Sequence, residues 1–73
     1  MTPAQLTNRL IGVPTGALLL IKDTDGDFGM RIFNSVKGEQ LMCDWGVTDS
    51  RNYLSDASSS HCSTIAGIRI LKR

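Results

Sequence analysis

The chain opens with a helical pattern of apolar positions. Leu6 and Leu10 stand four residues apart with Ile11 beside Leu10, so a helix places all three on one stripe. Thr2 followed by Pro3 is a typical helix start, because the threonine hydroxyl accepts from an amide of the first turn and proline has no N–H to leave unpaired. So short a helix is unstable alone. The pattern therefore predicts an N-terminal helix that packs through this stripe on the rest of the protein.

The next apolar segment, residues 17–22, has leucine or isoleucine on both faces of a strand. A strand that is apolar on both sides is covered on both sides, so the pattern favours an interior position in a sheet. The helix is the expected cover for one of the two faces.

Two alternating runs flank Lys37 and Gly38, which is typical of a hairpin with a two-residue loop. This loop pairs Val36 with Glu39 and thereby sets the register of the remaining residues. The face that the register assigns to the core carries Met30, Ile32, Leu41, Cys43 and Trp45.

The opposite face of the predicted hairpin keeps an apolar pair. Arg31 lies opposite Asp44 as a pair of opposite charges, and Phe33 lies opposite Met42. The Phe33 and Met42 side chains then need a second layer or a binding partner. We expect these two residues at the centre of a partner-binding surface.

The last third of the chain is polar until its end. Residues 46–54 have no regular pattern, and residues 56–63 are expected to form a serine-rich loop. Residues 64–71 alternate as a closing strand in which Gly67 can form a bulge. The predicted fold is α+β, with a short N-terminal helix packed on a small antiparallel sheet of about four strands.

Composition narrows the class of protein. A length of 73 residues suits one small domain, residues 1–73, and 41% hydrophobic with 21% charged residues is typical of a globular chain. A net charge of +1 does not by itself favour nucleic acid. The longest apolar run, residues 17–21, is far shorter than the roughly 20 residues that span a bilayer, so a soluble protein is expected.

Three aspartates, Asp23, Asp25 and Asp27, alternate around Gly26 with a spacing that is partly like a calcium loop. An EF-hand loop needs glycine at its sixth position, where Phe28 stands, and a glutamate at its twelfth. The segment is therefore predicted to be a turn between two strands, and no metal site is expected.

The soft ligands are few. Two cysteines and one histidine are too few for a disulfide framework or a four-ligand zinc site. They are Cys43, His61 and Cys62, and Cys43 is assigned to the core. His61 and Cys62 are adjacent, so they point apart on an extended backbone in a loop that we expect to be solvated. A cysteine nucleophile also needs an orienting group and a pocket. We expect free thiols, no cofactor, no catalytic residues and no enzyme activity.

Outward residues of the hairpin and the closing strand form the candidate interface. Its members are Phe33, Met42, Arg31 and Leu71, an apolar centre with charge beside it. Residues 57–73 carry three bases and no acid. These bases, Arg69, Lys72 and Arg73, are expected to contact the acidic rim of a protein partner or the phosphates of a nucleic acid.

Nucleic-acid binding is the alternative function. Small β-rich proteins stack single-stranded bases on exposed aromatic residues beside a basic groove. Phe33, Tyr53 and Phe28 could serve as such aromatics here, with Arg31 and the basic C-terminal segment as phosphate contacts.

The chain as a whole resembles the compact accessory proteins that lytic bacteriophages direct against host machinery. Among them it is similar to RNA polymerase-binding transcription regulators of the type that a Xanthomonas phage encodes. The likeness rests on the full length of 73 residues, the opening helix 2–11 and the hairpin 29–45. It implies attachment to the host polymerase near the N-terminus of the β′ subunit, inhibition of initiation and antitermination. It assigns no functional residue.

The expected function is therefore that of a monomeric, non-enzymatic phage protein that binds host RNA polymerase in the cytoplasm of the infected bacterium. Two alternatives stay open, a small nucleic-acid-binding module and an inhibitor of another host protein.

Overall fold

The computed structural model describes residues 1–47, 54–55 and 57–73. The elements are α1 (Pro3–Leu10), β1 (Leu18–Asp23), β2 (Phe28–Lys37), β3 (Gln40–Asp44), β4 (Gly46–Val47), β5 (Leu54–Ser55), β6 (Ser58–His61), the short 3-10 helix η1 (Cys62–Thr64) and β7 (Ile65–Lys72). The α+β class, with one N-terminal helix on an antiparallel sheet, is confirmed. The main sheet has five strands, not four.

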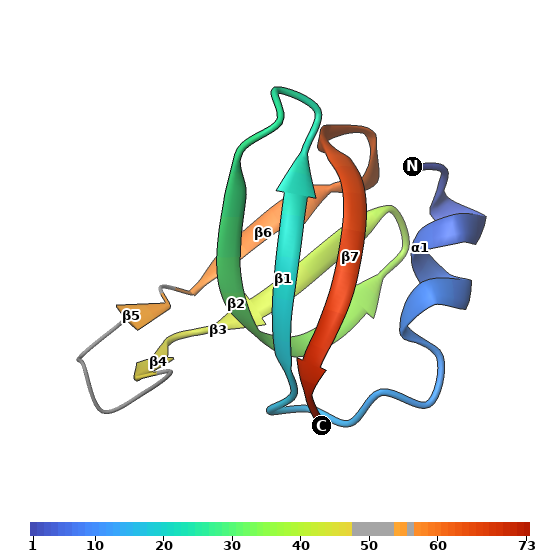
Figure 1. The fold of residues 1–73 in the computed structure, drawn as a ribbon. Coiled ribbons are helices and arrows are strands. Elements are labelled where there is room, and N and C mark those ends of the chain that lie inside the picture. Colours follow the sequence, from blue (N-terminus) through green and yellow to red (C-terminus); the bar gives the residue numbers. More distant parts are fainter. Residues whose placement is uncertain (48–53, 56) are drawn as a thin grey trace.

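The main sheet runs in the order β6-β3-β2-β1-β7, and every neighbouring pair is antiparallel. Strand β1 has neighbours on both sides, which confirms its predicted interior position. In Figure 1, β7, β1 and the first part of β2 form a near layer, while β3 and β6 pass behind them. The long strand β2 joins the two layers, and the core lies between them. Strands β4 and β5 pair separately as a two-stranded ribbon.

One apolar cluster fills the space between the layers and α1. Its buried members are Leu6, Leu10, Val13, Ala17, Leu19, Phe33, Leu41, Cys43, Cys62, Ile65 and Ile68. Within the described residues, no helix is long and apolar enough to cross a bilayer.

Helix α1 begins as the sequence predicts. The Thr2 hydroxyl accepts from the Gln5 amide, and the Gln5 side chain accepts from the Thr2 amide, so both caps of a capping box are present. Leu6 and Leu10 are buried, but Ile11 is 75% exposed, so its predicted place in the core is wrong. Ile11 follows the last helical residue with an extended ψ of 132°, and its side chain leaves the helical stripe.

The helix covers the free edge of β7. The Arg9 guanidinium donates twice to the Ile68 carbonyl, at 3.1 and 2.9 Å. The Met1 ammonium donates to the Cys62 carbonyl at 2.9 Å and also to that of Ile65. Edge carbonyls that would otherwise be open to another strand are thereby occupied.

The loop of the β2–β3 hairpin differs from the prediction by one position. Lys37 pairs with Gln40, so the two loop residues are Gly38 and Glu39. Gly38 has a φ of 60°, and tight hairpin turns require a positive φ at the first loop position. The glycine therefore takes the first loop position, although the sequence pattern had assigned it to the second.

A bulge at Asn34 then shifts the hairpin a second time. Ser35 pairs with Met42, whereas Phe33 pairs with Cys43, so Asn34 has no opposite residue on β3. The Asn34 side-chain amide donates to the Asp44 carboxylate at 2.9 Å.

These shifts reverse several predicted side-chain positions. Phe33 is only 5% exposed and belongs to the core, whereas Trp45, just after β3, is 63% exposed. Asp44 lies opposite Ile32, whereas the sequence pattern predicts Arg31 as its partner. The face assignment of the sequence analysis is therefore wrong for Phe33 and Trp45, and correct for Leu41 and Cys43, which are buried.

The C-terminal third is more regular than its composition indicates. Most of the predicted loop 56–63 is strand β6 followed by η1, and Cys62 is buried, not solvated. Gly46–Val47 and Leu54–Ser55 are paired, while residues 48–53 and 56 lie outside the described part. Strand β7 is confirmed, and its register shifts beside Gly67, where a bulge was predicted.

Candidate partner-binding face

The side of β1 that points away from the core defines a candidate site. Leu19 is fully buried, so Leu18, Leu20 and Lys22 point to the other side of the sheet. Residues that pair directly across antiparallel strands share a face, which extends this surface over β2 and β7. The outer face defined in this way carries Leu18, Leu20, Lys22, Phe28, Met30, Ile32, Arg69 and Lys72.

The centre of the outer face is apolar. Three of its side chains are half-buried but do not pack against the core cluster: Leu18, Leu20 and Met30. In Figure 1 no labelled element lies in front of β1 and its two neighbours. Met30 and Ile32, which the sequence analysis had assigned to the core, belong to this surface instead.

An aromatic ring stands at one end of the outer face. Phe28, the first residue of β2, is 64% exposed and pairs with Lys22. The Lys22 Nζ lies 5.7 Å from the centroid of the Phe28 ring, within range of a cation–π interaction. The ring therefore has one polar neighbour, while most of its surface stays open.

Charge is distributed unevenly around the apolar centre. Arg69 pairs with Leu20, and Lys72 pairs with Leu18, so the β7 side of the outer face is cationic. On the opposite side Asp44 pairs with Ile32. The outer face therefore has an apolar centre with a basic border on β7 and a single acid, Asp44, on the β3 side.

The structure does not bring together the partner-binding residues that the sequence indicated. Phe33 is buried, and Met42 lies half-buried on β3. Arg31 lies opposite Leu19, on the inner face. Leu71, 42% exposed, stands at a second register shift of β7, between the residues that pair with Leu18 and Leu19.

The three bases are placed more nearly as expected. Arg69, Lys72 and Arg73 are exposed, and the first two border the outer face. The sequence contained one signal for this surface, the alternation of Leu18, Leu20 and Lys22 with core residues, but it gave no sign that Phe28 would stand beside them.

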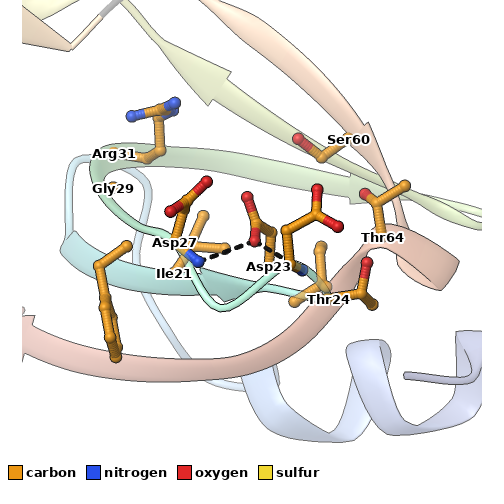
Figure 2. Close-up of a pocket in the computed structure, with 11 residues that line it drawn as sticks. Ile21, Asp23, Thr24, Asp27, Gly29, Arg31, Ser60 and Thr64 are labelled. Atoms are coloured by element: carbon orange, nitrogen blue, oxygen red, sulfur yellow. Dashed lines mark hydrogen bonds between the residues drawn. The ribbon is translucent and has the colours of Figure 1, made fainter.

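A hollow of about 410 Å³ lies at the end of the sheet, between the β1–β2 turn and β6. Figure 2 shows Arg31, Asp27 and Asp23 on one side of it and Ser60 and Thr64 on the other. Because the lining combines the Arg31 guanidinium with the carboxylates of Asp23 and Asp27, the hollow has no uniform charge that would attract an ion.

The aspartates of that turn have a structural role. Asp23 Oδ1 accepts from the amides of Asp25, at 2.9 Å, and Asp27, at 3.0 Å, and Gly26 has a φ of 91°. This is an Asp-Gly turn between two strands. No group of three potential metal ligands occurs in the part of the chain that the structure describes.

His61 caps η1. Its Nδ1 accepts from the Ser63 amide at 3.1 Å, so the ring proton resides on Nε2, which donates to Glu39 Oε2 at 2.9 Å. The Ser63 hydroxyl lies 2.8 Å from the same Nδ1. These contacts tie η1 to the β2–β3 loop.

Both thiols are free and buried. Burial raises the pKa of the Cys43 thiol above its ordinary value, although the positive charge of Arg31 and a hydrogen bond with Ser58 act in the opposite direction. A thiol in this environment is a poor nucleophile.

Comparison with protein-family models, curated proteins and solved structures found no match for this chain. Among the described residues, the outer face is the surface with the clearest capacity to bind a partner.

Proposed function

We propose that this protein is a non-enzymatic module that binds bacterial RNA polymerase through the outer face, inhibits initiation and promotes antitermination in the cytoplasm of an infected host. The observation that supports binding is the apolar centre of the outer face, which no labelled element covers (Figure 1). Contiguous apolar surface with a polar border is typical of a protein-binding site.

The chemistry of the face favours a protein over a small molecule. Leu18, Leu20 and Met30 lie side by side on paired strands and form a surface, not a pocket. Small ligands are held in concave sites that bury most of their area. A flat apolar surface suits the interface core of a second protein.

The identity of the partner comes from the resemblance to phage regulators of RNA polymerase, which implies the N-terminal region of the β′ subunit. Another host protein with a matching surface would use the same residues. The test must therefore name the partner as well as the surface.

A single strand of nucleic acid is the second candidate. The exposed Phe28 ring beside Lys22, with Arg69 on the same face, is an arrangement on which a base could stack. Binding of this kind weakens steeply with salt because counterions are released, whereas binding to an apolar protein surface does not.

The experiment measures binding of purified bacterial RNA polymerase to the immobilised protein, at salt concentrations from about 0.05 to 0.3 M. Leu20→Asp places a charge in the centre of the outer face and is expected to abolish binding. Ile11→Asp places the same charge on an exposed residue away from that face and should bind as the parent does. Circular dichroism of both variants verifies that they fold.

Transcription with the same proteins tests the regulatory part of the proposal. The parent and Ile11→Asp should reduce initiation and increase readthrough of a terminator, and Leu20→Asp should do neither. A parent protein that binds no polymerase at any salt concentration would refute the proposal.

A further inference from the structure

From the same outer face we infer the chemistry of the partner surface, and this inference rests on the proposed function as far as the face binds a protein. The partner presents an apolar patch that receives Phe28 and that is bordered by carboxylates on the side facing β7.

Phe28 is the most exposed apolar residue of the outer face, at 64%, whereas Leu20 and Met30 are half-buried. An aromatic ring with much open area and an ordered position is typical of an interface anchor. The Lys22 ammonium lies over the Phe28 ring and favours this position of the ring. Phe28 is therefore the residue that loses most exposed area when a partner binds.

The surface beside Lys22 is open on the side of β7. This lysine pairs there with Gly67, which has no side chain, and a methyl group placed on Gly67 would meet nothing within 4 Å. Arg69 follows two residues later on the same face. A partner side chain can therefore reach the sheet at Gly67 and lie beside Arg69, whose guanidinium favours a carboxylate there.

The border of the outer face is basic on the side of β7. Lys22, Arg69 and Lys72 are all exposed, and none of them takes part in a salt bridge among residues 1–47, 54–55 and 57–73. All three lie on β7 or next to it. Within the described residues no ion pair neutralises their charge, so a partner with carboxylates on that side of the face is complementary.

The acidic turn between β1 and β2 favours a protein over nucleic acid as the partner. Phosphates that follow a stacked base would pass close to the β1–β2 turn, because Phe28 is its next residue. That turn carries Asp23, Asp25 and Asp27, which repel phosphate. A protein surface can instead place single carboxylates beside Arg69 and Lys72, which pair with Leu20 and Leu18 and so lie farther from the turn than Lys22 does.

The test has one arm with polymerase and one arm without it. Phe28→Ala should weaken polymerase binding about tenfold, while Ile11→Ala, an apolar truncation elsewhere, should leave it unchanged. Arg69→Glu should slow association at low salt, with the effect fading above roughly 0.2 M, and Lys37→Glu at the far end of β2 should not. Polymerase that binds all four variants as it binds the parent would overturn the inference while leaving the proposed function intact.

The second arm probes the face with two dyes and an oligonucleotide. Anilinonaphthalene sulfonate, an apolar anion, should shift the amide resonances of β1, β2 and β7 on the outer face, and both Phe28→Ala and Arg69→Glu should reduce the shifts. The cationic dye thioflavin T should produce none. Shifts on another surface, or equal binding of both dyes, would overturn the inference even if no polymerase binds. Displacement of the anionic dye by oligo(dT), with a steep salt dependence, would assign the face to nucleic acid instead.

Discussion

His61 Nε2 lies 2.9 Å from Glu39 Oε2 and joins the β2–β3 loop to the 3-10 helix that precedes β7. The other ring nitrogen accepts from the Ser63 amide, so one imidazole serves two segments that are far apart in the sequence. A residue with this position acts as a structural clamp, although its residue type alone is also compatible with catalysis.

The clamp predicts the effect of replacing His61. His61→Ala removes the cap of η1 and the contact with Glu39, and should lower the free energy of unfolding by about 1 kcal/mol. His61→Asn keeps an acceptor for the Ser63 amide and should recover most of that loss. Urea denaturation measures both. Equal stability of His61→Ala and the parent would show that the cap contributes nothing.

The buried Cys43 thiol should make the folded protein less stable at alkaline pH. Burial raises the pKa of its thiol, so the folded protein holds the proton at pH values where the unfolded chain releases it. The stabilising effect is complete below the ordinary thiol pKa of about 8.5 and is lost as the pH rises through the higher folded value. Urea midpoints between pH 7 and 10 should fall for the parent and fall less for Cys43→Ala. Because Cys43→Ala is itself expected to be less stable than the parent, the quantity to compare is the slope of the urea midpoint against pH.

The aspartate turn predicts a structural and not an ionic role for Asp23. Asp23→Ala leaves the Asp25 and Asp27 amides without their acceptor and should lower the free energy of unfolding by about 1 kcal/mol. Asp25→Ala is the matched control, because no hydrogen bond of the turn uses the Asp25 carboxylate among the described contacts. Added calcium should shift no amide resonance of residues 23–27. A saturable shift there at submillimolar calcium would contradict this assignment.

The helix and strands β1 and β7 were predictable because their signals are local. Thr2 and Pro3 mark a helix start by themselves, and the alternation around Ile68 needs no knowledge of the neighbouring strands. The β2–β3 register was not predictable from the sequence, because alternation is compatible with several loop positions and nothing in the sequence marks Asn34 as a bulged residue. A single extra residue moves every later side chain to the other face.

Strand β6 was missed for a different reason. Its serines carry no apolar periodicity, and only the neighbouring strand β3, where Ser58 pairs with Cys43 and Ser60 with Leu41, makes them part of a sheet. The outer face was missed in turn, because Phe28 and Met30 could be assigned to a surface only after the register of β1 and β2 was known. Tertiary pairing, not local preference, decides these positions.

The reversed positions of Phe33 and Trp45 give the sharpest test of the register. Phe33 is 5% exposed beside Cys43 in the core, so Phe33→Ala leaves a cavity and should lower the free energy of unfolding by about 3 to 5 kcal/mol, enough to unfold much of so small a protein. Trp45 is 63% exposed, and Trp45→Ala should change stability by less than about 0.5 kcal/mol. Urea denaturation and amide spectra of the two variants provide the measurement. The alternative register, with Phe33 outward and Trp45 in the core, requires the opposite order of stabilities, so a stable Phe33→Ala with an unfolded Trp45→Ala would reject the bulge at Asn34 together with the outer face derived from it.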